Sequence, residues 1–131
     1  MTLRAVSTGG APDAIGPYSQ AIDIGSLVFV AGQVGLDPSS GELVGGGVDA
    51  QTERALRNIV AILDACGLGM ADVVKTTVLL ADIGDFAAVN AVYARFVSDP
   101  PPPRATYAVA ALPRGALIEI EAIAARLGSV V

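Results

Sequence analysis

The sequence contains no histidine, no tryptophan and a single cysteine, Cys66, among its 131 residues. Without histidine the chain cannot build a Ser-His-Asp or Cys-His triad or a typical catalytic zinc site. A carboxylate-only metal site would need an Asp-rich loop with ligand spacing, which is absent, so we expect no metal. One cysteine excludes a disulfide within the chain. Cys66 ends an apolar helical stripe, which predicts a small buried hydrophobe rather than a nucleophile.

Charged residues are also scarce, at 16% of the chain, and the net charge is −5 with a pI near 4.4. Lysine and arginine number only eight and are scattered along the sequence. Nucleic-acid binders need a positive field to displace counterions from phosphate. Anionic membrane surfaces likewise attract basic clusters. The composition therefore argues against nucleic acid and against a membrane surface as partners.

Long hydrophobic runs are missing as well. No uninterrupted apolar stretch approaches the roughly 18 residues that a bilayer-spanning helix requires. Residues 1–7 lack the apolar segment of a signal peptide. We therefore expect a soluble, cytoplasmic protein.

Hydrophobic residues, in contrast, make up 53% of the chain. The length suits one domain with one core, so we expect residues 1–131 to form a single domain. A domain of this size has a high surface-to-volume ratio and cannot bury that much apolar surface alone. Small alanine and glycine side chains account for part of the excess, but valine, isoleucine and leucine are abundant too. We therefore predict that a symmetric homo-oligomer covers part of the surface.

Hydrophobic periodicity predicts two helices. Asp49 is the expected N-cap of the first, which runs to about Cys66 and is followed by the C-terminal glycine Gly67. Asp85–Val97 is the second, ended by the prolines that follow. Asn90 is the unusual member of its apolar stripe, because an aliphatic side chain would pack better there.

Period-two alternation and β-branched residues predict five strands. The first two flank the turn residues Gly25 and Ser26, and a turn-rich loop over 37–47 follows them. The expected strands are 21–24, 27–31, 73–80, 105–109 and 117–127. The order β-β-α-β-α-β-β predicts an α+β fold, a mixed sheet with both helices packed on one face.

The last strand carries two carboxylates in a segment otherwise poor in charge. Ile118, Ile120 and their alternate neighbours form one face, suited to packing under the helices. Glu119 and Glu121 point to the other face. That face is either an ordinary solvated side of an antiparallel strand or a functional one, and alternation alone does not decide between them.

Arg104 and Tyr18 are the other candidates for chemistry. Arg104 follows four consecutive prolines, which hold it on a stiff approach to a strand, and its planar fork suits bidentate capture of a carboxylate. A plain surface arginine is the simpler interpretation from position alone. The Gly16-Pro17 turn aims Tyr18 in one direction.

Taken together, these residues resemble the reactive-intermediate deaminase family, RidA or YjgF. The resemblance covers nearly the whole chain, and no single motif carries it. The matching segments, in order, are Ile15-Gly16-Pro17-Tyr18-Ser19-Gln20, Ala31-Gly32-Gln33, Asn58, Val74-Lys75-Thr76-Thr77-Val78, Asp85-Phe86, Val89-Asn90, Tyr93, Phe96, Pro103-Arg104 and Ile118-Glu119-Ile120-Glu121-Ala122.

The resemblance implies a chorismate-mutase-like α+β subunit in a homotrimer with clefts between subunits. It also implies hydrolysis of 2-imino acids or enamines, such as 2-iminopropanoate and 2-iminobutanoate, to 2-keto acids and ammonia, without a cofactor. By the same resemblance, Arg104 binds the substrate carboxylate and Glu119 positions the attacking water. Tyr18 forms an aromatic wall, and Asn90 is the asparagine of the site.

Two positions depart from the family pattern. Ala31 stands where serine is frequent, and Thr106 stands where cysteine is frequent, two residues after Arg104. Both positions line the pocket in relatives, so substrate preference is more open than reaction type. Non-catalytic binding of small carboxylates and a ribonuclease or translation-inhibitor activity remain the alternatives.

Overall fold

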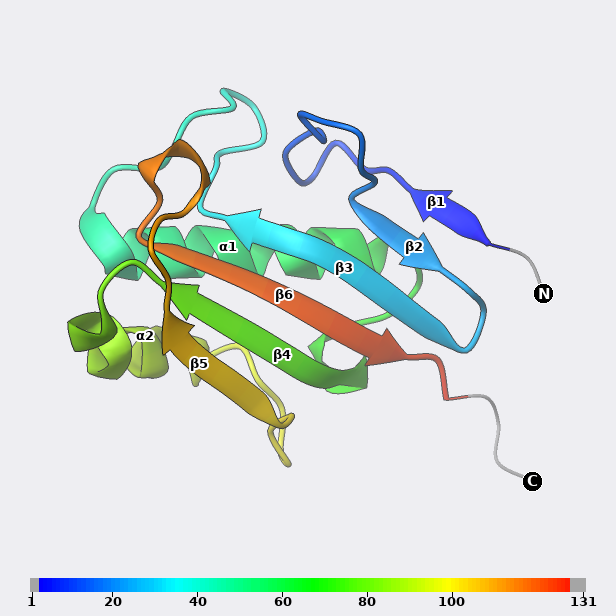
Figure 1. The fold of residues 1–131 in the computed structure, drawn as a ribbon. Coiled ribbons are helices and arrows are strands. Elements are labelled where there is room, and N and C mark those ends of the chain that lie inside the picture. Colours follow the sequence, from blue (N-terminus) through cyan, green and yellow to red (C-terminus); the bar gives the residue numbers. More distant parts are fainter. Residues whose placement is uncertain (1–2, 128–131) are drawn as a thin grey trace.

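The computed structural model describes residues 3–127. It contains a six-stranded sheet, and the strand that begins at Ile118, with apolar residues at every second position, lies inside that sheet. The strand order is β1-β2-β3-β6-β4-β5 (Figure 1). Among the strands of the described residues, only β4 and β5 run parallel, so the sheet is mixed, as predicted. The strands are β1 (Arg4–Val6), β2 (Ala21–Asp23), β3 (Leu27–Val34), β4 (Val73–Leu80), β5 (Arg104–Ala108) and β6 (Ile118–Ala125).

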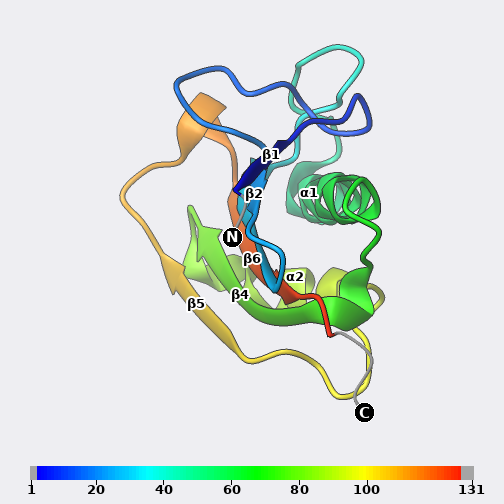
Figure 2. The ribbon, with the colours of Figure 1, turned by 90° about the vertical axis from the view of Figure 1, so that its right-hand side faces the viewer.

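Both helices, α1 (Gly47–Asp64) and α2 (Phe86–Tyr93), lie on one face of the sheet, behind it in Figure 1. Figure 2 shows α1 end-on beside the sheet. The predicted apolar face of α1 is buried against β6 and β3, which confirms the helical period. The buried residues of β6 are its predicted inner face, Ile118, Ile120, Ala122 and Ala124.

Several predicted boundaries were wrong. The helix α1 begins at Gly47, and its N-cap is Gly46 rather than Asp49. Gly46 has φ 109° and Gly47 has φ 78°, a left-handed backbone that glycine adopts without a Cβ penalty. Asp49 lies instead in the first turn, where a negative charge is favourable near the positive end of the helix dipole.

The second helix is shorter than predicted, since it ends at Tyr93 and gives way to turns before the prolines. An additional strand, β1, pairs with β2. β3 extends three residues beyond the predicted end, to Val34. The turn at Gly25 and Ser26 was predicted correctly.

Two smaller predictions were confirmed. Gly67 has φ 74°, and its N–H bonds back to the Asp64 carbonyl, which ends α1 in the expected way. Cys66 is buried, and burial raises the pKa of its thiol. Within residues 3–127, neither helix combines the length and apolar content that crossing a bilayer requires.

The buried carboxylate of Asp23 links residues near the two ends of the described chain. Asp23 accepts hydrogen bonds from Arg126 at 3.0 and 3.1 Å, from Arg4 at 3.1 Å and from the Gly25 N–H at 2.8 Å. Arg126 also donates to the Cys66 carbonyl at 2.8 Å, beyond the end of α1. These hydrogen bonds, those from Arg126 first, hold the pKa of Asp23 far below the usual aspartate range.

We predict that Asp23→Asn lowers the urea midpoint of unfolding at pH 7. A carboxyl with a depressed folded-state pKa stabilises the fold above its unfolded pKa of about 4 and loses that contribution as pH falls. The gap between parent and variant should therefore shrink when the same measurement is made at pH 3. The control is Asp64→Asn, at an exposed position of α1. A gap that does not depend on pH would contradict the ion-pair explanation.

Candidate functional site

Strand register places Arg104 and Glu119 on opposite faces of the sheet. Arg104 lies beside Thr76 of β4, whereas Glu119 lies beside Leu79 of the same strand. Positions 76 and 79 are an odd number of residues apart, and strand side chains alternate, so the two rows face opposite sides. Arg104 contacts α2 on the helix face, and Glu119 points to the face without helices. The two residues expected at one centre therefore do not meet within one chain.

The Arg104 side chain is held by three groups of α2. Its Nη2 donates a 2.6 Å hydrogen bond to Oδ1 of Asn90. The guanidinium carbon lies 4.7 Å from the centre of the Tyr93 ring and 5.4 Å from that of Phe86, within the range of cation–π attraction. The unusual amide in the apolar stripe of α2 thus accepts a hydrogen bond from the arginine.

Thr106 points to the same face of β5 as Arg104, two residues further on. Its hydroxyl oxygen is buried and has no hydrogen-bond partner among residues 3–127. A buried hydroxyl without a partner is destabilising unless another group satisfies it. The Thr106 hydroxyl is therefore a polar atom on the Arg104 face of β5 whose hydrogen-bonding capacity is unused within the described residues.

Glu119 lies against a glycine at an irregular point of β3. The register between β3 and β6 shifts between Val30 and Gln33, which marks a bulge that contains Ala31 and Gly32. A Cβ on Gly32 would lie 2.3 Å from Oε2 of Glu119. Only glycine therefore leaves room for the carboxylate in its present position.

The Glu119 carboxylate faces a pocket of about 70 Å³. Tyr18 stands at its wall, and the Tyr18 hydroxyl accepts a 3.2 Å hydrogen bond from the Ile15 N–H. Arg114 brings a positive charge to the same pocket, from the 3₁₀ turn Pro113–Gly115. The full lining is Pro12, Asp13, Ile15, Tyr18, Gln20, Gly32, Gln33, Val34, Leu36, Pro113, Arg114 and Glu119.

Burial raises the pKa of Glu119 above the usual glutamate value, and the negative charge of Glu121 raises it further. A raised pKa makes a carboxylate a stronger proton acceptor at neutral pH. Glu119 is therefore suited to general-base chemistry. Structural ion-pair networks also perturb pKa values, but Glu119 takes part in none of the ion pairs among residues 3–127.

Ala31 has its backbone groups occupied within the chain. Its N–H donates to the Gln20 carbonyl at 2.9 Å, and its carbonyl accepts from the Gln33 side chain at 3.2 Å. Gly32, its neighbour, lines the Glu119 pocket instead. Sequence reasoning quoted Gly32 only as part of a motif and did not single out Arg114, Phe86 or Tyr93 as site residues.

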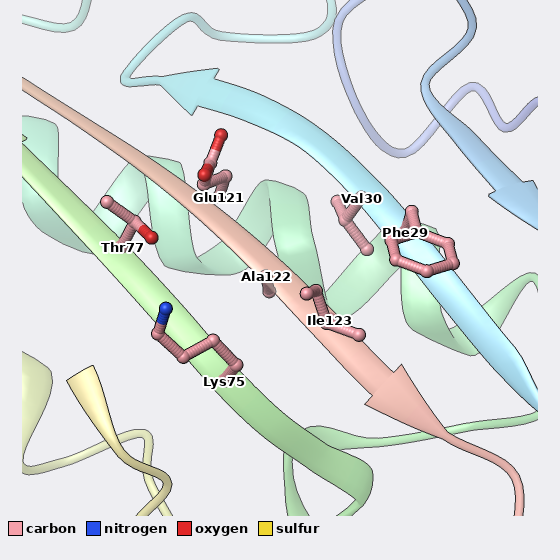
Figure 3. Close-up of a pocket in the computed structure, with 7 residues that line it drawn as sticks. All are labelled: Phe29, Val30, Lys75, Thr77, Glu121, Ala122 and Ile123. Atoms are coloured by element: carbon pink, nitrogen blue, oxygen red, sulfur yellow. The ribbon is translucent and has the colours of Figure 1, made fainter. Parts of the chain in front are cut away.

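The face without helices holds a second hollow, of about 230 Å³ (Figure 3). Lys75 of β4 and Glu121 of β6 bring opposite charges to it, from strands that pair with each other. Phe29 borders it and is 42% exposed. Within residues 3–127, no three side chains of the metal-ligating types gather into a group.

Known proteins are similar to this chain over nearly its whole length. A family model described as Endoribonuclease L-PSP matches residues 8–126. The human 2-iminobutanoate/2-iminopropanoate deaminase is 54% identical over 121 residues, which are 92% of this chain and 88% of the human protein.

Two solved structures have the same fold. RidA from an Antarctic Psychrobacter is similar with a TM-score of 0.91 and 45% identity, over 94% of this chain and 99% of that one. Escherichia coli TdcF with bound serine is similar with a TM-score of 0.90 and 41% identity, over 95% and 99%.

We predict that Gly32→Ala displaces the Glu119 carboxylate toward solvent and lowers its pKa toward the usual value. A carbon-13 NMR titration of the glutamate carboxyls measures this directly. The matched control is Gly45→Ala, because a Cβ there meets nothing within 4 Å. An unchanged Glu119 titration in Gly32→Ala would show that the glycine does not set the position of the carboxylate.

Proposed function

The chain belongs to the RidA/YjgF family, which the L-PSP endoribonuclease model represents, and on this basis we propose that it hydrolyses 2-imino acids and enamines to 2-keto acids and ammonia. The substrates we propose are small, such as 2-iminopropanoate and 2-iminobutanoate. The observation that carries the proposal is the similarity, at 54% identity over nearly the whole chain, to proteins named for this reaction. We place the activity in the cytoplasm.

We further propose that the active unit is a homotrimer with its sites in clefts between subunits. The opposite orientations of Arg104 and Glu119 support this, because a site that needs both must draw them from two copies. The helix-free face is suited to contact with other copies, since it exposes Phe29 and Tyr107. The high apolar content of the chain is consistent with such an interface.

The mechanism begins with binding of the substrate carboxylate by Arg104. Asn90 accepts one hydrogen bond from Nη2, and the other N–H groups of the guanidinium can donate to the substrate carboxylate. Fixing the carboxylate holds the C=N carbon in one place, which replaces a random encounter by an oriented approach. Thr106, two residues from Arg104 on the same face of β5, borders this position.

Hydrolysis then needs one water and one proton acceptor. The water oxygen bonds to the carbon of the protonated imine while Glu119 of the adjacent copy takes a proton from the water. The resulting tetrahedral intermediate carries a hydroxyl and an amino group on one carbon. Glu119 returns the proton to the nitrogen, which makes ammonia the leaving group. The C–N bond then breaks with its electron pair going to ammonia, while the hydroxyl proton passes to the Glu119 carboxylate and the C=O bond of the keto acid forms. Tyr18 and Asn90 shape the pocket around the reacting centre.

Loss of Arg104 should abolish most of the turnover. We predict that Arg104→Ala lowers kcat/KM by on the order of 100-fold or more, because the substrate is no longer oriented. Ammonia release is measured from 2-iminobutanoate generated in situ by a dehydratase. Arg57→Ala, an exposed arginine on the outer side of α1, is the control and should retain parent turnover. Equal turnover in Arg104→Ala and parent, with fold intact, would remove Arg104 from the site.

Mixing two inactive variants tests whether the site is divided between copies. Arg104→Ala and Glu119→Gln are unfolded together and refolded at equal amounts. In a cyclic trimer with shared sites, random mixing restores both residues in about a quarter of the sites, so about a quarter of the parent rate should return. No recovery, with mixed trimers verified by native mass spectrometry, would place both residues in the same copy's site.

The description of the family model favours RNA cleavage as a second candidate function. The net charge of −5 opposes it, because phosphate binding depends on basic surface. Incubation with single-stranded RNA at low salt separates the two functions. Binding of small carboxylates without turnover, the remaining alternative, would appear as affinity for 2-oxobutanoate in a protein that releases no ammonia.

A further inference from the structure

The guanidinium of Arg104 lies against two aromatic rings that come from one side of α2. Phe86, Asn90 and Tyr93 are four and three residues apart, so they share a helix face. We call Phe86 and Tyr93 the aromatic pair. The guanidinium carbon of Arg104 lies 5.4 Å from the centre of the Phe86 ring and 4.7 Å from that of the Tyr93 ring. The guanidinium also donates a hydrogen bond to the Asn90 amide oxygen.

These contacts hold the arginine without neutralising it. The ion pairs among residues 3–127 involve other arginines, at positions 4, 57, 95, 114 and 126. Arg104 instead contacts an amide dipole and two π faces, which attract a cation but carry no net charge. Its full positive charge thus stays available to an incoming carboxylate, while its long side chain is already fixed in place.

The Tyr93 ring is itself fixed by the strand next to Arg104. The Tyr93 hydroxyl and the Thr76 hydroxyl are 2.6 Å apart, and both residues are buried. Thr76 is the residue of β4 that lies beside Arg104 in the parallel pairing. Thr76 therefore contacts both the backbone of Arg104 and the ring of Tyr93 that packs on the Arg104 guanidinium. Phe86, in contrast, is 40% exposed and lies outside the two hydrophobic clusters of the described residues.

We propose that Phe86 and Tyr93 are positioning residues that preorient Arg104 for the substrate carboxylate. This inference rests on the proposed function and adds to it the residues that set the affinity for the carboxylate. The aromatic pair increases the share of molecules in which Arg104 is already placed for the carboxylate. Once the carboxylate is bound, Arg104 holds the substrate in the same orientation whether or not the aromatic pair is weakened. Weakening the aromatic pair therefore raises KM and leaves kcat unchanged.

The test weakens one π face without changing its shape. Phe86 is replaced by 4-fluoro-, 3,4-difluoro- and 3,4,5-trifluorophenylalanine, which withdraw electron density from the ring step by step. KM for 2-iminobutanoate and the Kd for 2-oxobutanoate should both rise with each fluorine. The total rise should be about 2- to 5-fold, the value of one partly exposed cation–π contact.

The chain supplies a matched control. Phe96 lies under the guanidinium of Arg57, at 5.7 Å, in a cation–π pair outside the site. The same fluorinated series at Phe96 should leave KM and the Kd for 2-oxobutanoate unchanged. A second variant, Tyr93→Phe, keeps the ring but removes its bond to Thr76, and should raise KM without lowering kcat.

The outcomes separate the two proposals. Constant KM and constant Kd across the Phe86 series, in a protein that Arg104→Ala inactivates, would overturn the positioning role and leave the deaminase function standing. If the protein shows no turnover but its Kd for 2-oxobutanoate rises along the Phe86 series, the deaminase function is overturned and the positioning role stands. Equal effects at Phe86 and Phe96 would also overturn the positioning role, since fluorination would then act through general packing.

Discussion

The strict alternation of side chains along β6 is the constraint on which the rest of the structure depends. β6 lies between β3 and β4, so it cannot shift without breaking two ladders. Its inner residues are buried under α1, and a slip of one position would place its glutamates there instead. The packing of the core therefore also decides where Glu119 points. The register of β6 that buries its apolar residues is therefore also the register that places Glu119 on the helix-free face.

The two candidate charges are prepared in different ways. Glu119 is made a stronger base by burial and by a neighbouring negative charge, and it lies against the bare Cα of Gly32. Arg104 keeps its charge uncompensated because its partners on α2 are neutral groups. One face of the sheet thus carries a base and the other a cation, and each lacks within its own chain the counterpart that the proposed chemistry requires.

Much of this arrangement could be predicted from the sequence, because it depends on local periodicity. The apolar stripe of α1, the alternation around Glu119 and the left-handed glycine at position 67 all follow from spacing. The short strand β1 was missed because Val6 is its only buried residue. Gly46 replaced Asp49 as the N-cap because a left-handed backbone, which no side-chain pattern reveals, opens the helix.

The relation between Arg104 and Glu119 depends on register, which local sequence does not contain. It requires knowing that β5 and β6 both pair with β4, and at which residues. The bulge near Gly32 and the stacking of Arg104 on α2 are likewise long-range results of packing. The resemblance to a family named Arg104 and Glu119 as candidates, and the strand register shows that one chain places them on opposite faces of the sheet.

The Asp23 ion-pair cluster has a consequence for the connectivity of the fold. Because Arg4 and Arg126 both bond to this one carboxylate, the beginning and the end of the described chain are neighbours in space. A short peptide could join them, and the chain could be opened in the surface loop that precedes α1 without changing any strand pairing. We expect a chain permuted in this way to form the same sheet. Circularly permuted versions of this protein are topologically equivalent to the natural one.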